Sequence, residues 1–393
     1  MGSIIYIRYI SGLSILNYII YIVNVENVIL RIIYNYIYWY SLVLFVPVKG
    51  GSNSEVRKIQ LTGGSTYIVS LPKKWITEHG LNSKDQVRIE WRPSGTLRVI
   101  ADASKVVRNR IVEINCREIP DHMIFDHLVA AYLSGANKII IYSKDDFSRK
   151  QSKIFRNFVK STRGLEIAND QGNKLEMISL LNPSEMPLYS SINRMYLLIS
   201  RQVIDFSDVL IGGDLEILED SAEREAEVDA LRLLLERQVG QILEFSTIED
   251  SLGTSRWEAS ELCKLVRTLE RMGDHSFALC DLAHSYKIPS TISMTSLPIS
   301  VIPIWQMSIK LLISNLRKRK ISEIHTAKSQ LISAQNDLLQ YEEELRSSEI
   351  DIQDALFLDR VSESLRRICA YSINMAEILM NIQTHRESKQ MYS

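Results

Sequence analysis

The sequence lacks the short motifs that mark many enzymes, and it has few cysteines. Its 393 residues contain no glycine-rich phosphate loop, no HExxH pair and no nucleophile elbow, so nothing indicates catalysis and we expect a protein that is not an enzyme. The four cysteines are far apart and have no CxxC or Cys/His ligand spacing. We interpret them as reduced core thiols of a cytoplasmic protein rather than as disulfide or zinc ligands.

Charged residues are scarce in residues 1–47, which hold 8 of the 17 tyrosines. The charged residues there are Arg8, Glu26 and Arg31. The two charge-free runs, 9–25 and 32–48, reach only the lower limit of length for crossing a bilayer, and the regions of a signal peptide are missing.

Three interpretations of this stretch stay open. It forms two short membrane helices, or it is a partly folded hydrophobic appendage, or it is translated AT-rich non-coding sequence, which the abundance of Ile, Tyr and Asn favours. On the favoured view the native chain starts near Val48 or Val56. We assign residues 1–55 to a hydrophobic extension and linker, and a membrane is a partner only if the extension is native.

Residues 56–101 form a small basic module rich in strands, with eight basic side chains against three acidic ones in a chain of net charge −1. Turn and strand signals predict short strands at 56–60, 66–71, 87–91 and 96–100, and a helix at 73–79. So small a module buries too little apolar surface alone, so we expect an obligate dimer. We place Val87, Ile89, Trp91, Ile68, Val69 and Trp75 in its core.

The charge of this module indicates DNA binding, because lysine and arginine neutralise phosphates and backbone N–H groups at a glycine turn add contacts. The candidates are Arg57, Lys58, Lys73, Lys74, Arg88 and Arg92, with Ser65 and Thr66 positioning the backbone. The alternative is that these charges only solubilise the module.

The stretch 57–101 resembles the SpoVT/AbrB-type DNA-binding domains. The resemblance is carried by the Gly-Gly-Ser-Thr turn, the SLPKKW step and the strand 85–91. It implies a swapped-hairpin β-barrel in which two chains interleave to bind DNA.

Residues 102–183 have the pattern of an α/β connecting domain. The predicted elements are strands at 106–114 and 136–142, helices at 121–133 and 146–162, and a hairpin at 166–181. Two interpretations of this domain stay open: it only links the head to the helices, or it contains a small-ligand pocket. The pairs Asp121-His122 and Asp126-His127 are spaced for helix N-terminal charge rather than for one metal face.

The rest of the chain is helical, and its breaks divide it into two three-helix bundles, at 184–290 and 297–385. The predicted helices are 188–211, 215–245, 257–285, 302–319, 321–346 and 350–384. The fold class is therefore multidomain and mainly α: a β head, an α/β middle and two bundles.

The first bundle is acidic, with 19 acidic and 7 basic residues between Asp205 and Asp281. Glu225 and Asp229, and likewise Glu270 and Asp274, share a helix face at i and i+4. Two such pairs on neighbouring helices offer oxygen ligands to a metal ion, with His275 as a nearby nitrogen. The alternative is a solvated acidic face with ion pairs to Arg224 and Arg271.

The segment 269–279, LERMGDHSFAL, resembles the third-helix signature of PhoU-type phosphate regulators, and Glu225–Asp229 falls where that family has its first-helix acidic motif. The resemblance extends over residues 187–384. It implies divalent or iron-type metal ions on Glu225, Asp229, Glu270 and Asp274. The second repeat departs from the pattern, with Arg366 and Ala370 at the acidic positions, so at most one metal face per chain is expected.

As a whole, residues 56–385 resemble archaeal phosphate-uptake regulators, in which a head of the AbrB type is joined to a PhoU-like body. The sequence therefore predicts a DNA-binding transcriptional regulator of phosphate uptake, with DNA and a second copy of itself as partners, and with phosphate transporter or signalling components as further candidates. The alternative is an adaptor that acts on a phosphate transporter or sensor kinase without binding DNA.

Overall fold

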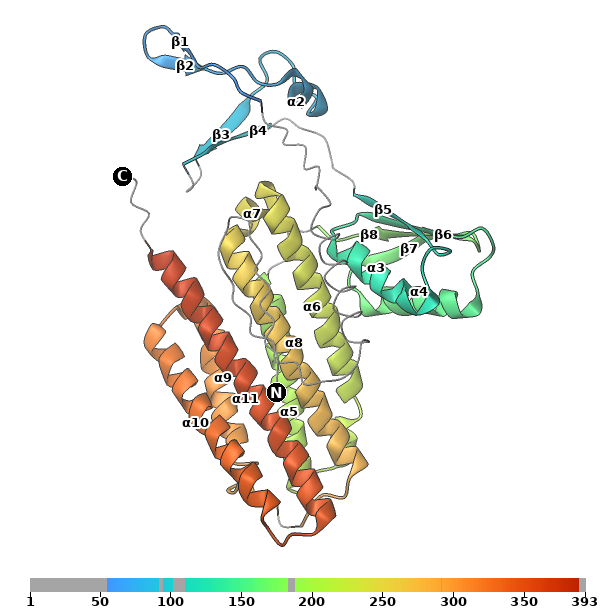
Figure 1. The fold of residues 1–393 in the computed structure, drawn as a ribbon, viewed down its shortest axis with the longest axis vertical. Coiled ribbons are helices and arrows are strands. Elements are labelled where there is room, and N and C mark those ends of the chain that lie inside the picture. Colours follow the sequence, from blue (N-terminus) through green and yellow to red (C-terminus); the bar gives the residue numbers. More distant parts are fainter. Residues whose placement is uncertain (1–54, 92–94, 102–109, 183–187, 291, 389–393) are drawn as a thin grey trace, which may run out of the picture. The chain divides into compact units, whose positions relative to one another are not determined.

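The computed structural model describes residues 55–91, 95–101, 110–182, 188–290 and 292–388 of the chain (Figure 1). These residues fall into two compact units, a small one mainly before residue 102 and a large one mainly after residue 109. The hydrophobic stretch 1–47 and the candidate Arg92 lie outside the described residues, so what the sequence predicts for them stays a prediction.

The head, residues 55–101, consists of two small sheets and one short helix. Strands β1 (Gln60–Thr62) and β2 (Thr66–Ile68) pair in antiparallel fashion, and β3 (Val87–Trp91) pairs with β4 (Leu97–Ala101). The tight turn between β1 and β2 requires glycine, because Gly63 and Gly64 have φ values of 62° and 82°. Helix α2 (Lys73–Glu78) starts after Pro72, as predicted.

Most apolar side chains of the head are exposed in the single chain. Tyr67 is 72% exposed and Trp91 is 86% exposed, whereas Leu81 and Ala101 are the buried hydrophobic residues in the described part of the head. The prediction that Ile89 and Trp91 point into a core is wrong for one chain, and Ile68 and Val69 are exposed as well. The physical reason is that two short hairpins and a helical turn provide no second layer against which β3 can pack.

Residues 110–182 form the α/β domain. Its sheet has the order β5-β6-β8-β7, in which β5 and β6 are parallel and the other pairs are antiparallel. The elements are β5 (Ile111–Asn115), η1 (Asp121–Met123), α3 (Ile124–Leu133), β6 (Lys138–Tyr142), α4 (Arg149–Ser161), β7 (Leu165–Asp170) and β8 (Lys174–Ser179). Helices α3 and α4 lie alongside the sheet (Figure 1), and Leu128 and Phe158 share one buried cluster with Ile139 and Ile141 of β6.

The two predicted three-helix bundles are present. The first contains α5 (Leu188–Leu210), α6 (Ser221–Glu244) and α8 (Arg256–Ser285), and the second contains α9 (Val301–Lys318), α10 (Ile321–Arg346) and α11 (Ile352–Glu387). Ser255 and Asp351 cap α8 and α11 by accepting hydrogen bonds from backbone N–H groups of the first turn. None of the helices in the described residues is long and apolar enough to cross a membrane.

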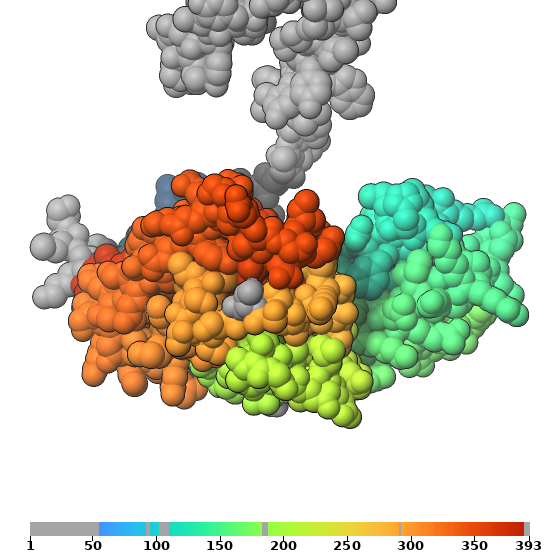
Figure 2. Space-filling model, turned by 90° about the horizontal axis from the view of Figure 1, so that it is seen from below, coloured from blue at the N-terminus to red at the C-terminus, as the bar shows by residue number. Residues whose placement is uncertain are grey.

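One buried apolar cluster runs through both bundles. It includes Leu269 and Met272 of α8 together with Leu365, Ile368 and Met375 of α11. Figure 2 shows the helices of both bundles, from yellow-green to red, as one continuous mass. The bundles are therefore halves of a single core.

The structure divides the predicted helix 215–245. A short 3-10 helix, η2 (Leu215–Leu218), precedes α6, because the Asp214 side chain accepts a hydrogen bond from the Glu216 N–H and starts a separate turn. The sequence also missed α7 (Ser246–Leu252), which ends at Gly253 in a left-handed conformation, φ 59°.

Candidate functional site

The four predicted metal ligands lie on α6 and α8, which pack side by side. Glu225 and Asp229 belong to α6, and Glu270 and Asp274 belong to α8. The helices approach closely at Gly273, where a Cβ atom would lie 3.1 Å from Cγ1 of Val228. The glycine within the ERMGD segment therefore brings the two acidic faces together.

Glu225, Asp229, Glu270 and Asp274, which we call the acidic cluster, act on one another electrostatically through their carboxyl groups. Burial raises the pKa of Glu225, and the charges of Asp229 and Asp274 raise it further. Burial and the charge of Asp274 likewise raise the pKa of Glu270, and burial and Asp229 raise that of Asp274. Like charges thus repel one another across the α6–α8 contact.

An arginine lies within this cluster. Arg232 of α6 places its Nε 3.3 Å from Glu270 Oε1 and 3.7 Å from Asp229 Oδ1. Its Nη1 lies 3.7 Å from Glu236 Oε1, which also accepts a 2.8 Å hydrogen bond from Arg267 Nε. A guanidinium therefore provides part of the positive charge that the sequence assigns to a metal ion.

The two arginines of the alternative sequence interpretation have other partners. Arg224 makes ion pairs with Asp205 at 2.6 Å and with Asp220 at 2.6 Å, and Arg271 lies over the ring of Tyr371 at 5.8 Å. Neither makes an ion pair with the cluster. The alternative is therefore wrong about ion pairs to these two arginines, although the charge of Arg271 does lower the pKa of Glu270 and Asp274.

The predicted ligands can hold a metal ion only if their oxygen and nitrogen atoms converge on one point. In the part of the chain that the structure describes, no group of three or more His, Cys, Asp or Glu side chains converges closely enough to hold one. His275 does not complete the cluster either, because its ring lies against Tyr371 of α11, 5.9 Å between ring centroids. The described side chains thus provide no converging ligand set, and the metal site stays a prediction.

The equivalent region of the second bundle contains an ion pair. Arg366 of α11 places its Nε 2.9 and 3.2 Å from the carboxylate oxygens of Glu342 on α10. Ser362 donates a further hydrogen bond of 3.1 Å to the same carboxylate. Arg366, which departs from the acidic pattern in the sequence, thus neutralises a buried carboxylate.

Another side of α6 contacts the α/β domain. The buried Arg237 donates hydrogen bonds of 2.5 and 2.8 Å to the backbone oxygens of Tyr132 and Ala136, at the end of α3. Arg110 pairs with Glu244 at 2.6 Å, and Arg163 pairs with Glu227 at 2.9 Å. One helix therefore carries half of the acidic cluster and the attachment of the α/β domain.

The sequence prediction missed Arg237 as a contact residue. Its signal is a charged residue two positions after the apolar run Leu233–Leu235 and two before Val239, a position where helical periodicity places it toward a buried face. The pairs Asp121-His122 and Asp126-His127 do not come together in one site. Asp121 accepts a 2.9 Å hydrogen bond from Gln151 Nε2, which is a structural role. His127 instead lines an open cleft of about 660 Å³ between β5 and α3, and the small-ligand pocket stays a prediction.

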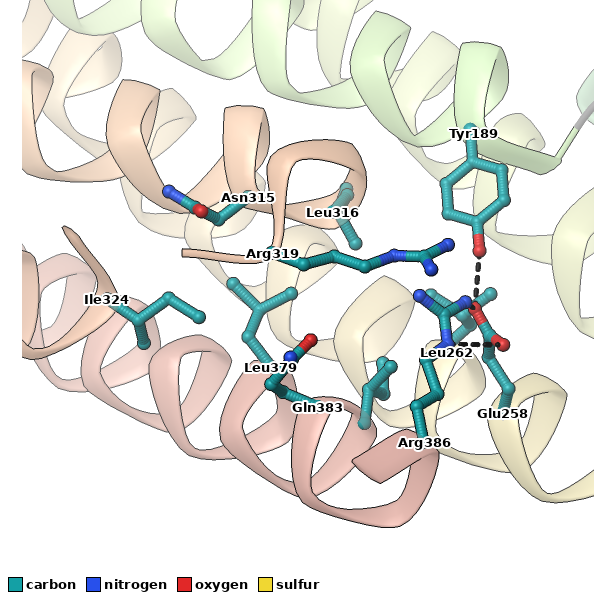
Figure 3. A pocket seen from close by; sticks show the side chains of 11 residues that line it. Tyr189, Glu258, Leu262, Asn315, Leu316, Arg319, Ile324, Leu379, Gln383 and Arg386 are labelled. Atoms are coloured by element: carbon teal, nitrogen blue, oxygen red, sulfur yellow. Dashed lines mark hydrogen bonds and ion pairs between the residues drawn. The ribbon is translucent and has the colours of Figure 1, made fainter. Parts of the chain in front are cut away.

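A polar contact joins the two bundles near the start of α8 and the end of α11 (Figure 3). Tyr189 of α5 donates a 2.5 Å hydrogen bond to Glu258 of α8, and Arg386 of α11 donates to the same carboxylate at 3.2 Å. Burial opposes ionisation of Glu258, but the hydrogen bonds from Arg386 and Tyr189 outweigh it and lower the pKa of this carboxyl. Burial and Glu258 raise the pKa of Tyr189 to about 12. The adjoining cavity, of about 10 Å³, holds little more than one water molecule.

The predicted DNA-binding residues are spread over the outside of the head. Seven of them lie in described residues and are exposed, namely Arg57, Lys58, Ser65, Thr66, Lys73, Lys74 and Arg88. Arg57 forms an ion pair with Glu55, and Lys74 lies 3.9 Å from Glu78. These positions are compatible with contact to a large polyanion.

Comparison with known proteins gives two family matches in different parts of the chain. The PhoU domain matches residues 192–283, from α5 to near the end of α8. The family described as antidote-toxin recognition MazE, bacterial antitoxin, matches residues 60–106. Among curated proteins, none matches the chain.

Two solved structures are similar to about half of this chain. One is PhoU from Pseudomonas aeruginosa, with 17% identity and a TM-score of 0.40, covering 50% of this chain and 96% of that protein. The other is the phosphate transport system regulatory protein PhoU from Streptococcus pneumoniae, with 14% identity and a TM-score of 0.42, covering 52% of this chain and 96% of that one. By its two family matches, the chain carries a PhoU domain in its first helical bundle and a MazE/AbrB-type domain in its head.

Proposed function

We propose that the protein is a transcriptional regulator of phosphate uptake, whose head binds DNA and whose helical body senses the state of the uptake system. The observation that carries the proposal is the joining, in one chain, of a MazE/AbrB-type head with exposed basic residues to a PhoU domain. The head supplies charge that neutralises the phosphates of DNA. The PhoU domain links this charge to phosphate uptake.

We infer that the head works as a homodimer. Tyr67, Ile89 and Trp91 are large apolar side chains with more than half of their surface exposed in the single chain. Contiguous exposed apolar surface marks an interaction site. A second head supplies the missing layer and doubles the basic charge that faces DNA.

Coupling between body and head would run through α6. Glu225, Asp229 and Arg232 lie on α6, so a change in the charge of the acidic cluster acts on this helix. The same helix contacts the α/β domain through Arg237. The α/β domain precedes the bundles in the chain and follows the head. No step of this coupling requires a metal ion, since protonation of Glu225, Glu270 or Asp274 alone changes the charge of the cluster.

The test is DNA binding at two salt concentrations, with duplex DNA from upstream of the protein's own gene. We expect a mobility shift that weakens at higher salt, and the variant Lys73→Gln/Lys74→Gln to lower the salt slope by about 2. The control Lys287→Gln/Lys310→Gln removes the same charge from exposed positions of the body. If the full-length protein gives no salt-dependent shift, the adaptor that acts on a transporter or sensor kinase becomes the better explanation.

A further inference from the structure

Helix α4 of the α/β domain presents a row of basic side chains. Its residues Arg149–Ser161 include five basic side chains and no acidic one. Four of them, which we call the α4 stripe, follow one another at spacings of four, three and four residues, and these are Arg149, Lys153, Arg156 and Lys160. This spacing places all four on one face over a length of about 16 Å.

The α4 stripe is exposed and has no carboxylate partner among the described residues. No ion pair in that part of the chain involves any of the four side chains, although Arg110, Arg117 and Arg163 of the same domain all have acidic partners. Like charges at i and i+4 repel one another by a few tenths of a kcal/mol. The positive charge of the stripe is therefore not neutralised by carboxylates of the described residues.

The fold of α4 does not depend on these charges. Phe155 and Phe158 bury its opposite face in the core of the α/β domain. Its first turn has a capping box, in which the Ser148 side chain accepts a hydrogen bond from the Gln151 N–H and the Gln151 side chain accepts one from the Ser148 N–H. The fold of α4 therefore leaves the four charges of the stripe available to a ligand.

The chemistry of the surface favours phosphodiester groups. A shallow groove of about 470 Å³ follows the stripe, and Ser152 and Asn157 contribute hydrogen-bonding side chains between the charges. The described residues of α4 include no exposed large hydrophobic side chain. Insertion into a bilayer and a protein–protein hot spot both require such side chains, whereas phosphate binding requires only the charges and donors present.

We propose that the α4 stripe is a second, sequence-independent contact with the phosphate backbone of the DNA that the head binds. About 16 Å along a duplex corresponds to roughly five phosphates of one strand, at 3.4 Å each, so four cations match the charge density of the backbone. The proposal rests on the proposed function, since it extends the DNA contact from the head to the α/β domain. It also makes the α/β domain part of the DNA-binding surface rather than a passive linker.

The test compares full-length variants in their affinity for a duplex of the upstream sequence and for an unrelated duplex, over a series of salt concentrations. Arg149→Gln/Lys153→Gln/Arg156→Gln/Lys160→Gln is expected to weaken both complexes by about tenfold or more and to lower the salt slope by about 3 to 4. The charge-matched control is Lys287→Gln/Lys310→Gln/Arg317→Gln/Lys318→Gln, all exposed positions of the body. Circular dichroism and thermal unfolding of each variant establish that it is folded.

The outcomes separate the two proposals. If the wild-type protein binds neither duplex, the proposed function itself fails. If Lys73→Gln/Lys74→Gln weakens binding but the stripe variant keeps the wild-type affinity and slope, the head binds DNA and the proposal for α4 is overturned. The proposal is also overturned if the stripe variant loses only binding to vesicles that contain phosphatidylserine, or only binding to an acidic partner protein.

Discussion

The guanidinium of Arg232 on α6 lies 3.3 Å from the carboxylate of Glu270 on α8, between two helices that otherwise present acidic groups to each other. The contact joins the two halves of the predicted metal face through an internal cation. It explains how four acidic side chains remain together when the described residues offer no converging set of metal ligands.

Replacement of Arg232 is therefore expected to open the cluster to metal ions. In Arg232→Gln the repulsion among Glu225, Asp229, Glu270 and Asp274 loses its internal compensation, so the variant should be less stable by about 1 to 3 kcal/mol. It should also bind Mn²⁺ or Zn²⁺ more tightly than the wild type. Calorimetric titration and urea unfolding measure the two effects.

The matched control is Arg267→Gln, because Arg267 pairs with Glu236 at 2.8 Å and makes no ion pair with Glu270 or Asp274. It should leave metal affinity unchanged. Purified wild-type protein with stoichiometric metal that is lost in Glu270→Ala/Asp274→Ala would establish the metal site and contradict this account of Arg232.

The raised pKa values of Glu225, Glu270 and Asp274 predict a specific dependence of stability on pH. The folded protein holds protons on these groups up to a higher pH than the unfolded chain does, so their contribution favours folding at low pH and declines as pH rises through the folded pKa values. At pH 7 the ionised groups destabilise the fold. Removal of charge at that pH should stabilise it.

The variant Glu225→Gln/Asp274→Asn should accordingly exceed the wild type in free energy of unfolding at pH 7. The difference should shrink as pH falls toward the ordinary carboxyl range, where the wild-type groups are protonated as well. Urea unfolding between pH 5 and pH 8 measures the difference. Glu343→Gln, at an exposed position of α10, serves as the control, and a constant difference at all pH values would rule out the cluster as its source.

Arg237 should stabilise the contact between the first bundle and the α/β domain. Arg237→Ala leaves the backbone oxygens of Tyr132 and Ala136 without their donor and removes a buried side chain, so we expect a loss of about 2 to 4 kcal/mol. Amide hydrogen exchange should become faster at the end of α3. The comparison variant Arg110→Ala removes a more exposed pair, with Glu244, and should cost less than about 1 kcal/mol.

The exposed apolar residues of the head predict its oligomeric state. Ile89→Lys/Trp91→Lys places charge on the surface that a second head would cover, and should convert the dimer into a monomer and weaken DNA binding. Light scattering after size-exclusion chromatography measures the mass. Asn82→Lys/Ser83→Lys, at exposed polar positions of the same head, should remain dimeric, and a dimer that survives in both variants would place the interface elsewhere.

The sequence predicted much of the fold because its signals are local. Helical periodicity and glycine turns act within a few residues, as at Gly63-Gly64 and at Gly172, which lies in the turn of the predicted hairpin 166–181. The predicted helix 321–346 agrees with α10 at both ends. The site was less predictable. Glu225 and Asp229 share a face by spacing alone, but the identity of their cation depends on how α8 approaches α6, and Arg232 is only one of several nearby arginines.

The head illustrates the same limit of prediction from sequence. Alternation along 87–91 predicts which side chains share a face, but whether that face is covered depends on a second layer. In one chain that layer is missing, so Trp91 is exposed although its spacing is that of a core residue. Periodicity reports the face of a strand, and only tertiary or quaternary contacts determine what lies against it.

The shared apolar core of the two bundles affects how the protein can be divided. The PhoU match ends with the first bundle, at residue 283, yet Leu269 and Met272 of α8 belong to the same buried cluster as Leu365 and Ile368 of α11. A fragment that ends at residue 283 would expose this apolar surface to solvent and should aggregate. The helical body should therefore unfold in a single cooperative transition, in which neither bundle melts before the other.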